Sequence, residues 1–320
     1  MTKRRLLKAG IALIAVYCLF CAVAGVLVSE TILHPVRHRL APADVAQAPA
    51  WAADDDASLA EVTIAAADGV SLQAWELRPE DANGDVVLLL HGLKGNRLEM
   101  MNYADMLLVH GYSVLMPDAR AHGNSGGELA TFGVLERDDI HRWVDWLEAN
   151  RHPRSVYGFG ESMGAAQLLQ SLNSETRFRA VAVECPFSTM RESAYDRIGQ
   201  RFRTGPWLGR TVFRPIVESA FLYARLRYGI DMNRASPEAA VAVTRVPVLL
   251  IHGLADENIP ARHSRRIAAR NNSVAIWEVP NTGHSNAIDT SPQQLEDRLV
   301  GWFGAHPASP AQVEERKPTE

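Results

Sequence analysis

Cysteine is scarce in this chain, with only three among 320 residues. Cys18 and Cys21 lie in an apolar run near the N-terminus, so Cys185 stands alone in the remainder and has no disulfide partner there. The histidines are scattered without the paired spacing of metal ligands, and the sequence contains no glycine-rich phosphate loop or dinucleotide-binding fingerprint. We therefore expect no metal and no cofactor.

Basic residues are also slightly fewer than acidic ones. Lysine and arginine together number 33 against 37 acidic residues, which gives a formal net charge of −4. Proteins that bind nucleic acid neutralise phosphates with a basic surface, so this balance argues against a nucleic-acid partner.

The most informative motif is G-E-S-M-G at 160–164. It follows a β-branched and aromatic run at 155–159 and precedes helix formers at 165–172, which predicts a strand, a sharp turn and a helix. Ser162 stands at the turn, where the close approach of neighbouring segments requires glycine two positions before and after it. The pattern indicates a serine nucleophile.

A serine nucleophile needs a histidine as general base and a carboxylate that orients the histidine. Downstream, the apolar run 246–251 leads into a loop that contains Asp256, and the run 274–279 leads into a glycine-flanked loop that contains His284. We therefore predict Ser162, Asp256 and His284 as catalytic residues. Their order along the chain is serine, acid, histidine.

An oxyanion hole is predicted from the loop after the buried strand at 85–90. His91 and Gly92 follow this strand directly, and backbone N–H groups here can stabilise the negative charge that develops on an attacked carbonyl oxygen. The expected donors are the N–H groups of Leu93 and of Met163, the residue after the nucleophile.

These motifs resemble those of the α/β-hydrolase superfamily over roughly residues 60–305. The segment P-D-A-R-A-H-G-N-S-G at 117–126 is similar to the Asp-x-Arg-Gly-His-Gly-x-Ser stretch of that superfamily, but has Ala121 where glycine is usual. The layout is most similar to monoacylglycerol lipase-like and serine aminopeptidase-like hydrolases, including bacterial membrane-anchored members.

The resemblance implies an α/β fold with a mostly parallel, doubly wound sheet, a helical lid insertion and an N-terminal membrane helix. The residues agree, because the apolar runs do not alternate with polar positions, as expected for strands buried on both faces. The runs 61–66 and 71–77 flank an Asp-Gly turn and predict an opening antiparallel pair. Substrate is then expected at the carboxyl ends of the parallel strands.

The alternation of predicted strands and helices is interrupted at 187–245, and we expect this segment to form the lid. Between Phe187 and Ala240 the sequence has nine arginines, no lysine and five acids, and apolar residues from 213 to 226 come close to helical spacing. One interpretation is a surface that meets an anionic bilayer or a lipid substrate. The interspersed acids favour the other, a solvated arginine face over a hydrophobic pocket cover.

The N-terminal segment 1–30 is interpreted as a transmembrane anchor or signal sequence. Basic residues at 3–8 precede twenty uncharged residues, Ala9 to Val28, which are long enough to cross a bilayer. The basic cluster predicts a single-pass anchor with the catalytic domain on the extracytoplasmic, periplasmic side. The small residues at 22–24 leave signal cleavage and secretion as the alternative. A linker at 31–58, a hydrolase domain at 59–305 and a flexible tail at 306–320 are expected to follow.

The predicted function is serine hydrolysis of a carboxylic ester or thioester, with a small-molecule or lipid acyl substrate. The same residues support amide or peptide cleavage, and a non-catalytic membrane-tethered binding domain is a further alternative. Glu184 and Glu257 are rival acids to Asp256. Glu161 is expected to be structural, and His252 is interpreted as a turn residue.

Overall fold

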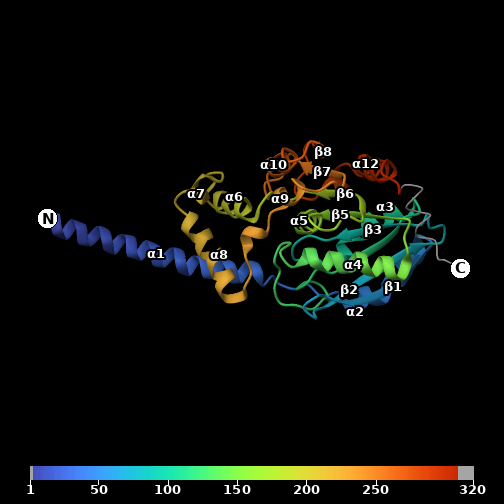
Figure 1. Cartoon of the computed structure of the whole chain (residues 1–320), viewed down its shortest axis with the longest axis horizontal. Coiled ribbons are helices and arrows are strands. Elements are labelled where there is room, and N and C mark those ends of the chain that lie inside the picture. The colour runs from blue at the N-terminus through green and yellow to red at the C-terminus, as the bar shows by residue number, and fades with distance from the viewer. Residues whose placement is uncertain (1–2, 309–320) are drawn as a thin grey trace.

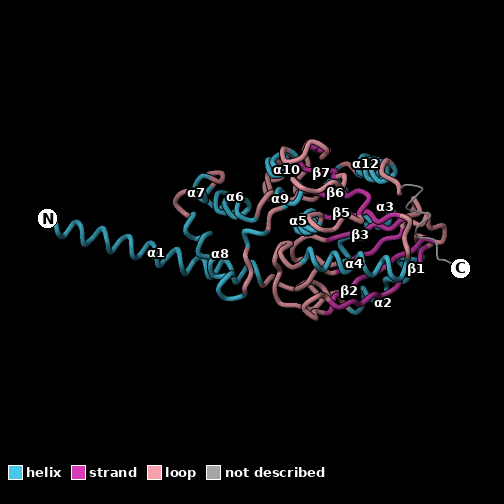
Figure 2. The backbone as a smooth tube through the Cα atoms, in the orientation of Figure 1, coloured by secondary structure: helices cyan, strands magenta, loops and turns pink. Residues whose placement is uncertain are grey.

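The computed structural model describes residues 3–308, and an eight-stranded sheet forms its centre (Figures 1 and 2). The strand order is β1-β2-β4-β3-β5-β6-β7-β8; β2 pairs with β1 and β4 in antiparallel fashion, and the other neighbouring pairs are parallel. The strands are β1 (Ala57–Ala65), β2 (Ser71–Pro79), β3 (Asp85–Leu90), β4 (Ser113–Pro117), β5 (Ser155–Glu161), β6 (Phe178–Glu184), β7 (Val248–Gly253) and β8 (Ala275–Val279).

Helices cover both faces of the sheet, as expected for a doubly wound α/β fold (Figure 1). They are α1 (Lys3–Leu33), α2 (Pro42–Asp54), η1 (Arg97–Met100), α3 (Met101–Leu108), α4 (Glu136–Arg151), α5 (Ser162–Ser171), α6 (Met190–Phe202), α7 (Trp207–Arg210), α8 (Arg214–Tyr228), η2 (Met232–Arg234), α9 (Pro237–Val241), α10 (Arg262–Ala268), α11 (Ala287–Thr290) and α12 (Pro292–Gly304).

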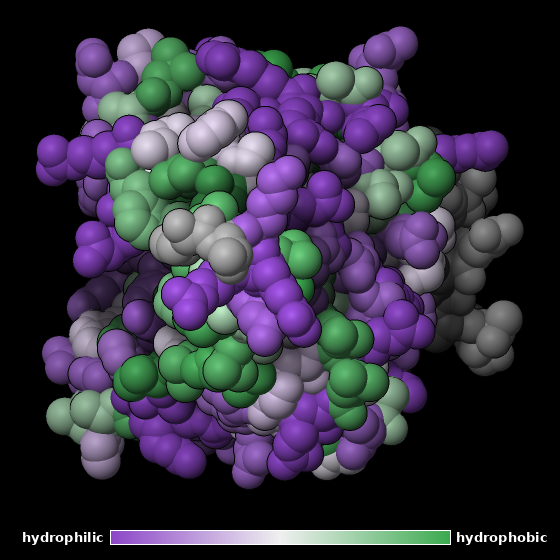
Figure 3. All heavy atoms as spheres, turned by 90° about the vertical axis from the view of Figure 1, so that its left-hand side faces the viewer, coloured by the Kyte–Doolittle hydropathy of each residue, from purple (hydrophilic) through white to green (hydrophobic). Residues whose placement is uncertain are grey.

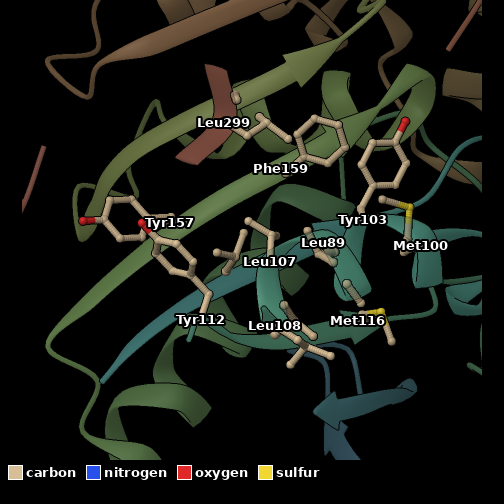
Figure 4. Close-up of a cluster of buried hydrophobic side chains, with 14 of the residues drawn as sticks. Leu89, Met100, Tyr103, Leu107, Leu108, Tyr112, Met116, Tyr157, Phe159 and Leu299 are labelled. Carbon is tan, nitrogen blue, oxygen red and sulfur yellow. The ribbon is translucent and has the colours of Figure 1, made fainter. Parts of the chain in front are cut away.

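The predicted strands and the mostly parallel sheet are confirmed. All residues of β3 are buried, because hydrophobic clusters fill both faces of the sheet. On one face, Leu107 of α3 lies near Leu89, Phe159 and Leu299, which come from β3, β5 and α12 (Figure 4). This packing holds the carboxyl ends of β3 and β5 side by side, where the serine motif and the His-Gly loop begin.

The segment 31–58 differs from the expected linker. Helix α1 continues to Leu33, and α2 forms from the alanine-rich stretch with Pro42 at its start. Ala48 and Ala52 of α2 are fully buried in the hydrophobic core. An alanine-rich segment is a good helix former, and burial of its small side chains stabilises it against the sheet. The expected tail at 306–320 lies, from residue 309 onward, outside the described residues.

Helices α6, α7 and α8 occupy the expected lid insertion. Helix α8 covers the run with helical spacing and buries Val217, Ala220, Phe221 and Ala224. The lid packs against α1, which projects far from the hydrolase domain (Figure 1). By length and composition α1 is apolar enough to cross a membrane, a test that signal sequences also pass.

The contact between α1 and α8 is very close at Gly25. A Cβ atom at this position would lie 2.6 Å from Ser219 Cβ and 2.8 Å from the backbone of Ala220. We predict that Gly25→Leu forces the two helices apart at a cost of about 1–3 kcal/mol, and so accelerates tryptic cleavage of the lid after Arg203 by roughly tenfold. Limited proteolysis of the detergent-solubilised chain measures this rate.

The matched control is Gly10→Leu, because a Cβ atom at Gly10 of the same helix meets nothing within 4 Å. Equal cleavage rates in the two variants would contradict the tight packing of α1 on the lid.

Candidate active site

Ser162 stands at the junction of β5 and α5, in the sharp turn that the sequence predicts. Its φ is +50°, a left-handed conformation that is costly for a non-glycine residue. A Cβ atom at Gly164 would lie 2.3 Å from the Leu90 carbonyl oxygen, and one at Gly160 would lie 2.7 Å from the Gly164 carbonyl carbon. Side chains at either glycine would therefore push the turn away from the end of β3.

The structure brings Ser162, His284 and Asp256 into one chain of hydrogen bonds. His284 Nε2 is 2.7 Å from Ser162 Oγ, and His284 Nδ1 is 2.7 Å from Asp256 Oδ2. The rival acids lie elsewhere. Glu184 accepts hydrogen bonds from the Ala287 N–H and the Tyr103 hydroxyl, while Glu257 is exposed.

Asp256 is a buried acid held in its charged form. Burial by itself would raise the pKa of Asp256, but hydrogen bonds with His252 and His284 and from the Ile259 N–H outweigh it and hold this pKa below its ordinary value. Its Oδ1 also accepts a hydrogen bond of 2.8 Å from the Asn258 N–H. A charged Asp256 favours the tautomer in which His284 Nδ1 carries the proton, which leaves Nε2 free to accept the serine proton.

His252 has a larger part than the turn position expected from the sequence. It belongs to β7, is fully buried, and has Nε2 3.4 Å from Asp256 Oδ2. Its Nδ1 is 2.7 Å from Ser264 Oγ and its Nε2 is 2.7 Å from the Ile259 carbonyl oxygen. No local pattern signals this contact, because His252 lies in a strand and Asp256 lies in the loop after it.

The His-Gly loop lies directly against the nucleophile. A Cβ atom at Gly92 would be 3.7 Å from Ser162 Cβ, and both Leu93 and Met163 line the pocket that contains Ser162. His91 anchors the loop, since its Nε2 accepts a hydrogen bond from the Ala119 N–H and its Nδ1 is 2.7 Å from the Gly92 carbonyl oxygen. Burial lowers the pKa of His91 to about 4, so this side chain is neutral.

The 117–126 segment packs next to the His-Gly loop and holds the chain that follows it. Asp118 accepts hydrogen bonds from the backbone and guanidinium of Arg97, at 2.8 and 2.7 Å, and from the Asn124 N–H. A Cβ atom at Gly123 would overlap the Asp118 carboxylate at 2.1–2.4 Å. Ala121, the departure from the resembled pattern, has a φ of +61°, which explains why glycine is usual there.

Glu161, next to the nucleophile in the chain, lies near two other carboxyl groups. Burial, followed by the nearby Glu184 and Glu99, raises the pKa of Glu161 to about 8. Burial also raises the pKa of Glu184 and of Glu99. Glu161 Oε1 would be 3.2 Å from a Cβ atom at Gly92, so this acid supports the His-Gly loop, in line with the expected structural role. A protonated Glu161 avoids the repulsion between buried like charges.

Cys185, His252 and Asp256 are the one group in residues 3–308 whose donor atoms lie close enough together to hold a metal ion. Their ligand atoms are all within 4.8 Å of one another. Both nitrogens of His252 and both oxygens of Asp256 already take part in the contacts described above, and burial raises the pKa of the Cys185 thiol well above its ordinary value. The chemistry of this donor set therefore does not favour a metal.

A pocket of about 590 Å³ opens beside Ser162 and His284. Most of its wall is apolar, and the lid supplies many of the lining side chains, such as Phe187, Met190 and Phe221. The last turns of α1 form another part of the wall. Such a pocket suits an elongated apolar group whose reactive carbonyl lies next to Ser162.

Comparisons with known proteins identify the family. Residues 87–298 match the model of the "Alpha/beta hydrolase family", and the chain belongs to this family. YqkD of Bacillus subtilis is 30% identical over 207 residues, which are 64% of this chain and 65% of YqkD. The chain therefore spans slightly less than two thirds of the length of this relative.

Solved structures show the same fold at low sequence identity. The Pyrococcus furiosus esterase Pf2001 is similar with a TM-score of 0.67 and 21% identity, over 86% of this chain and 99% of the esterase. Acylaminoacyl peptidase of Pyrococcus horikoshii is similar with a TM-score of 0.60 and 19% identity, over 82% of this chain and 44% of the peptidase. The predicted superfamily and fold are thus confirmed.

The raised pKa of Glu161 predicts a pH dependence of stability. Between pH 4.5 and about 8 the folded protein keeps a proton on Glu161 that the unfolded chain loses, so the free energy of unfolding falls as the pH rises. Glu161→Gln does not titrate and is expected to reduce this fall by at least about 1 kcal/mol. Urea unfolding at about pH 5 and about pH 8 measures the difference. A fall as large as in wild type would contradict the assignment, and Glu61→Gln on the exposed side of β1 is the control.

The conformation of Ala121 predicts a stabilising substitution. Ala121→Gly should raise the free energy of unfolding by about 0.5 kcal/mol, because relief of the left-handed strain exceeds the added entropy of the unfolded chain. Ala149→Gly on the exposed side of α4 should instead lower it by about 1 kcal/mol. Thermal and urea unfolding of both variants decide the point, and a destabilised Ala121→Gly would argue against strain at this turn.

Proposed function

We propose that the protein is a serine hydrolase that cleaves carboxylic ester or thioester bonds through an acyl-enzyme. The observation that carries this proposal is the hydrogen-bonded series from Ser162 Oγ through His284 to Asp256, at 2.7 Å in each step. Family membership adds support, because the fold places such a series at the carboxyl ends of its strands.

The first half of the reaction forms the acyl-enzyme. Ser162 Oγ attacks the substrate carbonyl carbon while His284 Nε2 takes the hydroxyl proton, and Asp256 stabilises the imidazolium that results. The tetrahedral intermediate collapses when His284 gives this proton to the leaving oxygen or sulfur. In the second half, His284 takes a proton from water, the hydroxide attacks the acyl carbon, and the acid leaves as Ser162 regains its proton.

The N–H groups of Leu93 and Met163 hold the carbonyl oxygen in both halves. Met163 is the second residue of α5, so its N–H belongs to the first turn of a helix, where the backbone donors lack partners within the helix. Leu93 follows Gly92 on the loop that His91 fixes to Ala119. Two donors in place before the reaction begins stabilise the oxyanion without the reorganisation that water needs.

The lining of the pocket favours an acyl ester over a small polar substrate. An apolar wall binds an alkyl chain by removing it from water, at about 0.8 kcal/mol for each buried methylene group. The similarity to a named esterase supports ester cleavage, while the similarity to acylaminoacyl peptidase keeps amide cleavage as the alternative. Paired ester and amide substrates with the same acyl group distinguish the two.

We also propose that α1 is an uncleaved anchor. The basic residues at 3–8 would remain in the cytoplasm, and the hydrolase domain would lie on the opposite, periplasmic side. Support comes from the docking of residues 25–33 on the lid, which gives this helix a structural role in the folded protein.

Substitution of the proposed catalytic residues tests the function. Ser162→Ala and His284→Ala should each lower kcat/KM for p-nitrophenyl esters by about 10⁴-fold or more, because both halves of the reaction need each side chain. Only Ser162→Ala removes the atom that a fluorescent fluorophosphonate modifies. Ser174→Ala, on the exposed surface beyond α5, is the control. A Ser162→Ala variant that retains turnover would sink the proposed mechanism.

A further inference from the structure

The C-terminal end of α1 forms part of the pocket. Val28, Ser29, Ile32 and Leu33 line the same cavity as Ser162 and His284. Leu33 is almost fully buried, and its carbonyl oxygen accepts a hydrogen bond from the Ala130 N–H. The helix that is apolar enough to enter a membrane is therefore continuous with the wall of the acyl pocket.

Contacts join α1 to the lid over four turns. The Tyr17 hydroxyl donates to the Val212 carbonyl oxygen, and Gly25 lies against Ser219. Nearer the pocket, the hydroxyl groups of Tyr223 and Tyr228 donate to Glu30 at 2.5 and 2.6 Å. The side of α1 that faces α8 carries its small residues at intervals of four, namely Cys21, Gly25 and Ser29, which allows the close approach.

The length of α1 sets the position of the lid relative to a bilayer. Only Ala9 to Val16 lie between the basic cluster and the first lid contact at Tyr17. Eight helical residues rise about 12 Å, whereas the hydrocarbon core is about 30 Å thick. If α1 crosses the bilayer, the part of the lid that contacts Tyr17 lies near the bilayer centre, and the contact of Gly25 with Ser219 lies in the leaflet nearest the domain.

The surface of the lid suits that position. Trp207, Leu222 and Leu226 expose 61%, 57% and 76% of their area, although each is large and apolar. Arg225 and Arg227 are exposed on the same helix as Leu222 and Leu226, and long arginine side chains can reach phosphate headgroups. Figure 3 shows the molecule from the side on which α1 projects, with hydrophobic side chains among hydrophilic ones.

We propose that the lid is embedded beside α1 in the leaflet nearest the domain, and that the pocket takes acyl esters of lipids directly from that leaflet. This proposal adopts the first of the two interpretations of the arginine-rich segment, namely a surface that meets a bilayer. The choice of substrate rests on the proposed hydrolase function, whereas the position of the lid does not. The acyl chain would pass from the leaflet along α1 and place its carbonyl group at Ser162.

The position of the lid is tested without catalysis. The full chain is reconstituted into vesicles of phosphatidylethanolamine and phosphatidylglycerol that include a phosphatidylglycerol with a diazirine on its acyl chain. After illumination, mass spectrometry locates the labelled peptides. We expect labels on residues 202–226 as well as on α1, and none around Val109 or Val243, which are equally exposed apolar residues of the hydrolase domain. Labels confined to α1 would overturn the proposal.

The source of the substrate is tested with a lid variant. Trp207→Ser, Leu222→Ser and Leu226→Ser are combined, since none of these residues lines the pocket. We expect at least tenfold slower hydrolysis of a long-chain acyl ester in vesicles and unchanged hydrolysis of p-nitrophenyl acetate. The control combines Val109→Ser and Val243→Ser and should affect neither substrate.

The outcomes separate the two proposals. If the wild-type chain hydrolyses neither ester, the proposed function fails, while the labelling result still decides where the lid lies. If p-nitrophenyl acetate is hydrolysed and the lid variant cleaves the vesicle ester at the wild-type rate, uptake from the leaflet is overturned. Equal losses on both substrates would show that the lid residues act on the catalytic centre and would also contradict the proposal.

Discussion

The close approach of Gly164 to the end of β3 is the constraint on which the site depends. Because no Cβ atom intervenes, the first turn of α5 rests on the Leu90 carbonyl, and the His-Gly loop emerges beside Ser162. The nucleophile, the loop that faces it and the helix start are thus positioned by one backbone contact. The left-handed conformation of Ser162 is the strain that this contact imposes, and the buried sheet on both sides of β3 and β5 holds it in place.

The buried carboxyl groups around this contact have pKa values shifted in opposite directions. Burial raises the pKa of both Glu161 and Glu184, and the nearby Glu184 and Glu99 raise that of Glu161 further. Asp256 is also buried, but two histidines and backbone N–H groups hold its pKa down. Asp256 is the acid for which hydrogen bonds and the nearby His284 outweigh burial, whereas the two hydrogen bonds to Glu184 do not. Charged Asp256 orients His284, and neutral Glu161 supports the His-Gly loop.

Local sequence patterns predicted the sheet, the serine turn and the meeting of Ser162 with His284 and Asp256. These predictions succeeded because a residue in the loop directly after a parallel strand lies at the carboxyl edge of the sheet, whichever strand it follows. The patterns missed α2 and the role of His252. Alanine and proline near acidic residues are typical of a tether, and only the burial of Ala48 and Ala52 against the core makes that stretch a docked helix. His252 was missed because its partners come from tertiary contacts with the loop after β7.

The docking of α1 has a consequence for the protein as a reagent. A soluble version that begins after residue 40 would retain Ser162, Asp256 and His284 but would lack Ile32 and Leu33, so one side of the cavity would be open to water. Such a version would report the chemistry of the catalytic residues faithfully. Its preference among acyl chain lengths would reflect an open groove rather than the enclosed pocket of the full chain. Inhibitors selected against it would therefore be complementary to the groove and not to the enclosed pocket.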